Sequence, residues 1–267
     1  MIMAIVQARM GSTRLPGKIM MKIRDKPLLH YIINQIHYSK KINKLVIATT
    51  NKEQDDQIIK FVNLCDVETF RGNEENVLDR YYQCAKKYNT DIIVRITSDC
   101  PLIDPQLIDK CITEFENNDF DYFSNVNKKV NEVWTYHLCG FPMGFAVEVF
   151  TFDALEQAWK NAKKPSEKEH VTQFILNNPK LFRIGNIENY KDYSNIRLTV
   201  DHQIDFDLVK FLIEYFPDGE IFDIEKIITF FNKNPHLQSL NSHLPFNEGF
   251  LKSLEKDEIE KYNSINY

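Results

Sequence analysis

Short apolar runs rich in valine and isoleucine alternate with amphipathic segments along most of this chain, and this alternation restricts the fold more than any other feature. An apolar run followed by a helical period predicts a βαβ unit, and a series of such units predicts a mainly parallel sheet. We expect strands at residues 2–8, 44–49, 67–70, 91–97, 121–124, 145–150, 182–187 and 195–200. We expect helices at residues 27–39, 55–64, 76–88, 105–117, 152–163, 167–176, 204–215, 224–231 and 248–262. The sequence therefore predicts an α/β fold.

The loop after the first expected strand is dense in groups that bind anions. Residues 9–18 contain two glycines, two hydroxyl side chains and the cations Arg9, Arg14 and Lys18. Glycine allows backbone N–H groups to turn toward an anion, and arginine can hold phosphate oxygens with two N–H groups. Because open α/β sheets bind ligands at the carboxyl ends of their strands, the loop predicts a triphosphate site. The alternative is an ordinary solvated loop with surface charge.

This loop is neither a P-loop, which ends in Gly-Lys-Ser/Thr, nor the Gly-x-Gly-x-x-Gly of dinucleotide-binding folds. Residues 8–18 (ARMGSTRLPGK) instead resemble the signature loop of the cytidylyltransferases that make CMP-activated acidic sugars. The resemblance is closest to the spore coat polysaccharide biosynthesis F-type branch of that superfamily. Further matches follow in order over roughly residues 1–215, at 71–72, 76–81, 95–104, 147–150, 169–172 and 197–201.

The resemblance implies a fold, a nucleotide and a set of site residues. The fold is a three-layer, Rossmann-like nucleotide-diphospho-sugar transferase sheet, to which the sequence adds a C-terminal helical appendage. The residues expected to bind CTP are Ala8, Arg9, Gly11, Ser12, Lys18, Arg71 and Arg80. Those expected to act in catalysis are Arg14, Lys18, Asp99 and Asp201, and those expected to bind the acceptor are Glu148, His170 and Arg197.

Two aspartates follow expected strands and predict a metal site. Asp99 comes after the strand at 91–97, and Asp201 comes after the strand at 195–200. A carboxylate that faces a triphosphate repels it unless a divalent cation lies between them, and Mg²⁺ prefers such oxygen ligands. The resemblance assigns both aspartates this role. The alternative is that each side chain caps a turn or a helix.

Several of these residues also allow a structural interpretation. Arg80 lies within an expected helix and could pair with a carboxylate such as Asp79 instead of facing the site. Glu148 and His170 could equally serve packing. One position departs from the family pattern: Ala146 stands where spore coat relatives usually carry an aspartate. This departure leaves the identity of the acceptor open, although it does not affect the nucleotide.

The predicted reaction is attack by an acceptor oxygen on the α-phosphorus of CTP, which transfers CMP and releases pyrophosphate. The surplus of cations predicts an anionic acceptor, such as a sugar phosphate, an ulosonic acid or another phosphorylated metabolite. One alternative is a glycosyltransferase of GT-A type that consumes a nucleotide sugar. It would need an Asp-x-Asp metal motif, for which Asp205-Phe206-Asp207 is the candidate. A second alternative is a subunit that binds a nucleotide without catalysis.

Composition narrows the class of protein. The net charge of −5 and the lack of a basic stripe argue against a nucleic-acid partner. No apolar run approaches the ~18 residues that a membrane span needs, and five scattered cysteines indicate reduced thiols, so we expect a cytoplasmic protein. We expect a nucleotidyltransferase domain at 1–217 and a helical extension at 218–267. The aromatic segment 127–144 is expected to be an insertion with hairpin-like strands that contributes to the acceptor site or to a homodimer contact.

Overall fold

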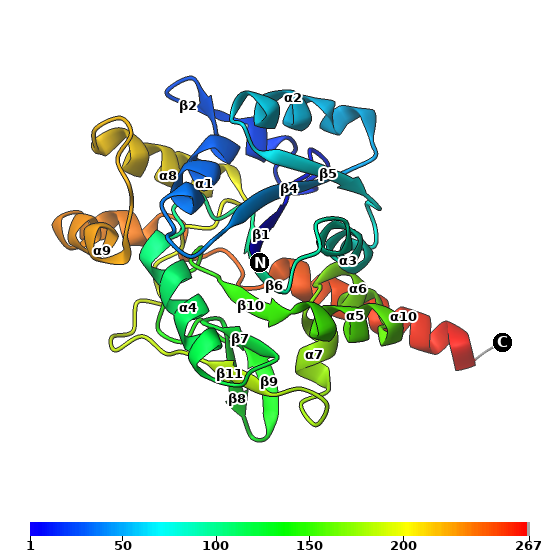
Figure 1. Cartoon of the computed structure of the whole chain (residues 1–267). Coiled ribbons are helices and arrows are strands. Elements are labelled where there is room, and N and C mark those ends of the chain that lie inside the picture. Colours follow the sequence, from blue (N-terminus) through cyan, green and yellow to red (C-terminus); the bar gives the residue numbers. More distant parts are fainter. Residues whose placement is uncertain (266–267) are drawn as a thin grey trace.

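The computed structural model describes residues 1–265, with side chains to residue 259, and its centre is a twisted sheet (Figure 1). In the described chain this sheet has seven strands in the order β11-β7-β10-β6-β1-β4-β5. The strands are β1 (Ile2–Gln7), β4 (Lys44–Thr50), β5 (Glu68–Gly72), β6 (Ile92–Thr97), β7 (Tyr122–Ser124), β10 (Glu148–Thr151) and β11 (Ile184–Asn186). Strand β10 runs antiparallel to both of its neighbours, and the other pairs are parallel.

Helices cover both faces of the sheet and create the expected three layers. In the central strand β1, Ala4 and Val6 belong to one core cluster and Met3 and Ile5 to the other, which explains its continuous apolar sequence. The first cluster is covered by α1 (Leu28–His37), α2 (Asp56–Leu64), α4 (Pro105–Asn117), α8 (Gln203–Tyr215) and α9 (Ile224–Lys233). The second is covered by α3 (Val77–Lys87), α5 (Phe152–Asn161) and α7 (Gln173–Asn177). The predicted α/β fold class is confirmed.

Two expected elements are wrong in detail. The strand predicted at 195–200 forms only an isolated bridge between Arg197 and Met143, because its buried residues pack beside a loop instead of joining the sheet. The single helix predicted at 167–176 is two short helices, α6 (Pro165–Glu169) and α7, and Val171 between them has a φ of 57°. A small hairpin, β2 (Lys22–Ile23) with β3 (Lys26–Pro27), was not expected.

The segment 127–144 contains the expected hairpin. Strands β8 (Asn127–Val130) and β9 (Val133–Tyr136) pair antiparallel, and the two residues between them, Asn131 and Glu132, both have positive φ values. Two such residues match the turn that suits the twist of a two-residue hairpin. The homodimer contact expected here stays a prediction.

The C-terminal region packs against the core of the domain instead of lying outside it. Phe222 and Leu237, which lies in the 3₁₀ helix η3 (Pro235–Ser239), belong to the same core cluster as β1. The buried amide of Gln35 donates to the carbonyls of Ile103 and Phe222, which ties this region to α1 and α4. Helix α10 (Glu248–Ile265) then crosses the molecule and packs on α6 (Figure 1). Among the described helices, none combines the length and the apolar character that a membrane crossing requires.

Gly144 precedes β10 and predicts a measurable stability effect. Its φ is +106°, and an added Cβ would lie 2.8 Å from the carbonyl carbon of Leu198. Gly219 is a matched control, because its φ is +79° but its Cβ would meet nothing within 4 Å. We expect Gly219→Ala to lower the free energy of unfolding by about 1 kcal/mol through backbone strain alone. Gly144→Ala should cost about 3 kcal/mol or more, since the clash adds to the strain. Urea unfolding measures both, and equal losses would show that the backbone near Leu198 yields.

Candidate active site

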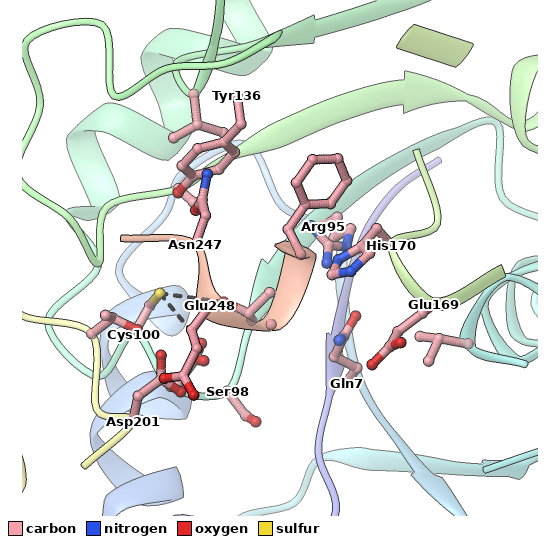
Figure 2. Close-up of a pocket in the computed structure, with 18 of the residues that line it drawn as sticks. Gln7, Arg95, Ser98, Cys100, Tyr136, Glu169, His170, Asp201, Asn247 and Glu248 are labelled. Carbon is pink, nitrogen blue, oxygen red and sulfur yellow. Dashed lines mark hydrogen bonds between the residues drawn. The ribbon is translucent and has the colours of Figure 1, made fainter. Parts of the chain in front are cut away.

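A cavity of about 670 Å³ opens at the carboxyl ends of β1 and β6. The loop after β1 lines one side of it, and residues from segments 97–100, 143–148, 169–173 and 197–201 line others. Residues 247–256, at the start of α10, complete the lining. Figure 2 shows this arrangement, with Asp201, Ser98 and Glu248 toward one side and Arg95 and His170 toward the other.

The loop after β1 brings most of its predicted residues to the cavity. The backbone turns tightly, because the N–H groups of Ser12 and Gly17 both donate to the carbonyl of Met10 and Gly17 has a φ of +69°. The loop residues that line the cavity are Ala8, Arg9, Ser12, Thr13, Arg14 and Lys18. Gly11 does not line it. An added Cβ there would face the side chains of Gln54 and Glu74, so its small size serves packing in the loop rather than close approach of a ligand.

Lys18 joins the two strand-end aspartates. Its Nζ lies 2.9 Å from Asp201 Oδ1 and 3.4 Å from Asp99 Oδ2, and it donates to the carbonyl of Val200 at 2.6 Å. Burial alone would lower the pKa of Lys18, but the charges of Asp99 and Asp201 outweigh it and raise that pKa. The lysine is therefore a fixed, fully charged cation at the floor of the cavity.

Asp201 receives further cations. Arg14 Nη2 lies 2.5 Å from Asp201 Oδ1, and Arg197 Nη2 lies 3.5 Å from Asp201 Oδ2. Burial opposes ionisation of Asp201, but Lys18 and Arg14 lower its pKa to about 2. Asp201 is therefore a carboxylate at any physiological pH. It does not cap α8, because His202 is the N-cap of that helix, and the carboxylate of Asp205 accepts from the backbone N–H groups of Asp201 and His202.

The donor set of Asp99 and Asp201 fits Mg²⁺. The described residues contain no group of three or more His, Cys, Asp or Glu side chains placed to hold a metal, so this is not a complete protein cage. Mg²⁺ is commonly held by one or two carboxylates together with water and substrate phosphates, and the carboxylates of Asp99 and Asp201 beside an anion-binding loop supply that set.

Arg80 is a buried cation with no carboxylate of its own. The residue is 2% exposed, its Nε has no partner among the described residues, and its Nη2 donates only to the carbonyl of Glu74. Burial lowers the pKa of Arg80, and Arg9 nearby adds to this effect. Asp79, the partner considered above, instead accepts from Trp159 and Gln83. A buried guanidinium that lines a cavity without a counterion fits a site for an anionic ligand.

Arg71 lies outside the cavity lining. Its Nη1 pairs with Asp56 at 2.7 Å, and its Nε and Nη2 donate to the carbonyls of Thr50 and Lys52. All of these partners belong to the end of β4 and the start of α2. The residue therefore joins two elements of the scaffold, and we leave it out of the site that we propose below.

Arg197 lines the cavity, but its guanidinium is already occupied. Its Nε and Nη2 donate to the fully buried Asp205, which also accepts from Asn241. Asp205 thereby fixes the segment that carries Asp201. Asp207 is exposed and accepts from Gln203 on the same helix. The Asp-x-Asp motif is thus divided between a buried ion pair and the surface, which removes the support for a glycosyltransferase metal site.

The other side of the cavity holds Glu148 and His170, two of the three residues predicted to bind the acceptor. Glu148 is buried and accepts from Thr172 Oγ1 at 2.6 Å and from Tyr122 Oη at 2.8 Å. His170 Nε2 lies 3.0 Å from Ser253 Oγ of α10. Burial and the charge of Arg95 lower the pKa of His170 to about 4, although Glu169 opposes this, so the imidazole is neutral near pH 7.

Sequence reasoning missed some of the lining. Arg95 lies within the matched segment 95–104 but was not predicted as a site residue, although an arginine between apolar residues of a strand is costly to bury and could have indicated a role. Tyr136 reaches the cavity from the hairpin. No signal in the sequence indicates that residues 247–256 return to this site, because their partners lie far away along the chain, 46 positions for Glu248 and His202 and 84 positions for Ser253 and Glu169.

Comparison with known proteins agrees with this geometry. A profile of the family described as Cytidylyltransferase matches residues 3–227. The chain belongs to the cytidylyltransferase family. It is 42% identical to an uncharacterized protein of Methanocaldococcus jannaschii over 91% of this chain and 95% of that protein. It is 31% identical to the spore coat polysaccharide biosynthesis protein SpsF of Bacillus subtilis over 88% of this chain and 95% of that protein.

A solved cytidylyltransferase has the same fold. The structure of a cytidylyltransferase from Leptospira borgpetersenii matches with a TM-score of 0.81 and 32% identity, over 92% of this chain and 99% of that one. Family membership makes this chain a nucleotidyltransferase, so a subunit that binds a nucleotide without catalysis is no longer needed as an alternative. The family profile ends before α10, which supplies part of the cavity lining.

Proposed function

We propose that this cytidylyltransferase transfers CMP from CTP to a small acceptor that carries a phosphate or a carboxylate, with release of pyrophosphate. The observation that carries the proposal is the cluster of Arg14 and Lys18 on Asp99 and Asp201 at the floor of the cavity. This cluster combines fixed cations with two ionised oxygen ligands, which are the groups that phosphoryl transfer requires. The relative that functions in spore coat polysaccharide biosynthesis supports a product used for a surface glycan.

The nucleotide would extend from this cluster toward Arg80. Ala8, Arg9 and Ser12 line the cavity from the loop, and Arg80 contributes a buried guanidinium without a counterion. These residues are suited to hold the phosphates and the nucleoside of CTP. The cytidine preference itself rests on membership of the family and on the resemblance of the loop.

The reaction forms a bond between an acceptor oxygen and the α-phosphorus of CTP and breaks the bond from that phosphorus to the bridging oxygen of pyrophosphate. Lys18 and Arg14 offset the negative charge that develops on the phosphate oxygens, so catalysis is mainly positioning and electrostatics. Asp99 and Asp201 would hold Mg²⁺, which neutralises charge on the phosphates when bound. His170, with a pKa of about 4, is a weak base. An acceptor whose attacking oxygen is already ionised therefore suits the site best.

A nucleotide panel tests the proposal. CTP, UTP, GTP and ATP are each incubated with sugar phosphates and ulosonic acids, and pyrophosphate is measured. We expect CTP to exceed the other nucleotides by about tenfold or more in kcat/KM, a difference of about 1.4 kcal/mol in transition-state binding. A tenfold preference for GTP would refute the cytidylyl assignment but keep the nucleotidyltransferase reaction. Activity without pyrophosphate release would refute both.

Glu248 of α10 is expected to weaken CTP binding. Its carboxylate lies 3.7 Å from Arg14 Nη1 and 3.3 Å from His202 Nε2, beside the phosphate loop. An incoming triphosphate would meet this negative charge and would compete with it for Arg14. We therefore expect Glu248→Gln to tighten CTP binding by about three- to tenfold, as is typical of one partly exposed charge pair.

Glu255→Gln is the matched control for this change. Glu255 is an exposed glutamate on the same helix and does not line the cavity. Titration calorimetry with CTP should find wild-type affinity in Glu255→Gln. Weaker binding in Glu248→Gln would instead mean that Glu248 holds Arg14 in the orientation that CTP requires.

A further inference from the structure

Arg95 sits in the middle of the sheet with part of its guanidinium unused. It lies on β6, where it pairs with Ile5 of β1 on one side and with Glu148 of β10 on the other. Its Nη1 donates to Glu148, its side chain is 12% exposed, and it lines the cavity. The buried Nε has no partner, and Nη2 donates to no residue in the described part of the chain. Burial closes off Nε from the cavity, so the group that Arg95 offers to a ligand is Nη2, whose N–H groups no described residue accepts.

Glu148 is saturated by its neighbours and cannot itself bind a ligand well. One carboxylate oxygen accepts from Tyr122 and Thr172, and the other accepts from Arg95. Tyr122 is in turn held by Asn127, whose Nδ2 lies 2.6 Å from the tyrosine oxygen. Because all of these groups are buried or nearly so, the guanidinium of Arg95 is fixed in orientation. Glu148 thus fixes the position of Arg95.

His170 beside Arg95 is neutral, and its tautomer follows from its partners. Ser253 has one hydroxyl proton, and its oxygen lies 2.6 Å from Glu169 Oε2, which can only accept. The ring nitrogen Nε2 of His170 must therefore carry the hydrogen in its contact with Ser253. Its Nδ1 is left as an acceptor. The neutral imidazole therefore neither repels Arg95 as a cation nor pairs with it as an anion.

We infer that Arg95 binds the oxyanion of the acceptor and that Glu148 is the positioning residue that aims it. The inference rests on the proposed function and names the part of the site that recognises the acceptor. The Nη2 of Arg95 carries two N–H groups and a charge, which suit an oxygen of a carboxylate or phosphate. Arg95 and His170 lie across the cavity from Asp201 and Ser98 (Figure 2). An acceptor that accepts from Arg95 with one oxygen of its phosphate or carboxylate keeps another oxygen of that group for the attack on the α-phosphorus.

Arg197, which the sequence suggested for the acceptor, is a poorer candidate for this role. Its guanidinium is taken up by Asp205, Asp201, Met143 and the carbonyl of Pro245. These partners occupy the N–H donors of Arg197, whereas Arg95 keeps donors that no described residue accepts. Arg197 therefore stabilises the segment that carries Asp201, and Arg95 binds the ligand.

The test measures binding of two anionic probes to protein saturated with a non-hydrolysable CTP analogue. One probe is 3-deoxy-manno-octulosonate, a carboxylate, and the other is glucose 1-phosphate; glucose is the neutral comparison. We expect at least one anionic probe to bind more tightly than glucose, and which one does so distinguishes a carboxylate from a phosphate acceptor. Arg95→Lys should weaken that binding by about tenfold or more. Lysine keeps a positive charge for Glu148 but lacks the second terminal nitrogen of the guanidinium that would face the ligand.

Control variants separate recognition from folding. Arg183→Lys changes an exposed arginine that pairs with Asp121, and it should leave probe binding unchanged. The double variant Arg95→Gln with Glu148→Gln removes both buried charges together, so a loss of probe binding in a folded protein has the same meaning. Affinity for the CTP analogue should change by less than about threefold in these variants, as expected for separate sites.

Three results would overturn the inference: neither anionic probe binds the nucleotide-loaded protein, glucose binds equally well, or binding survives in Arg95→Lys and in the double variant. Failure of wild-type protein to bind the CTP analogue is a different result. It would remove the proposed function itself, and the acceptor site with it.

Discussion

Lys18→Met is expected to lower kcat by about 10³-fold while weakening CTP binding much less. The lysine is buried, and Asp99 and Asp201 hold it as a charged group at the floor of the cavity. A fixed point charge interacts most strongly with the negative charge that grows on the phosphates during transfer. Its loss should therefore appear in kcat, measured by pyrophosphate release at saturating CTP, more than in the dissociation constant for CTP.

The design needs two controls, because methionine leaves Asp99 and Asp201 without their shared cation. Urea unfolding of Lys18→Met shows whether the fold survives this change. Lys22→Met alters an exposed lysine four residues along the chain that lies outside the cavity, and it should keep wild-type kinetics. If a folded Lys18→Met turned over CTP at a near-normal rate, the transferring phosphate would have to lie elsewhere in the cavity.

The sequence predicted this cluster because a parallel sheet places the ends of its strands together. Lys18 and Asp99 follow β1 and β6, which lie side by side and parallel although β4 and β5 come between them in the chain. Asp201 follows a segment that the sequence presented as a strand. The segment only bridges to Met143, yet it runs parallel there and delivers Asp201 to the same edge. The prediction of the site therefore survived an error in the secondary structure.

Other residues depend on contacts that no local pattern reveals. Arg71 lies near the end of β5, but Asp56 and two carbonyls occupy its guanidinium. Whether an arginine faces a ligand or a neighbouring loop is decided by the nearest acceptor in three dimensions, and the sequence does not give that distance. The free donors of Arg95 are known only once Glu148 is seen to pair with it across β6 and β10.

Helix α10 is the clearest case of a feature that sequence could not place. Its charged sequence predicted a terminal helix and indicated no contribution to the site. The structure instead fixes it through Asp257, which accepts from Ser166 at the start of α6, and through Ser253 between Glu169 and His170. These contacts bring Glu248 and Phe250 into the cavity lining. The segment that lies beyond the family profile therefore shapes the site.

Asp201→Asn is expected to lower turnover by about 10²-fold or more, and Asp99→Asn to do the same, because each removes an ionised oxygen ligand for Mg²⁺. The two variants should nevertheless differ in the absence of metal. Asp201 holds Arg14 at 2.5 Å as well as Lys18, whereas Asp99 contacts Lys18 alone of these two cations. Loss of the charge at Asp201 frees Arg14, so metal-free CTP should bind Asp201→Asn as tightly as wild type or more tightly.

Three measurements distinguish a metal ligand from a structural pair at Asp201. Titration of Mn²⁺ in the presence of CTP should find weaker metal binding in both variants, and calorimetry without metal gives the CTP affinity. Asp207→Asn, an exposed change on the same helix start, should match wild type in all assays. Unchanged Mn²⁺ affinity in a folded Asp201→Asn would show that this carboxylate only orders Lys18 and Arg14. The loss of activity would then follow from their displacement, and the metal would have to be held by Asp99 and the phosphates alone.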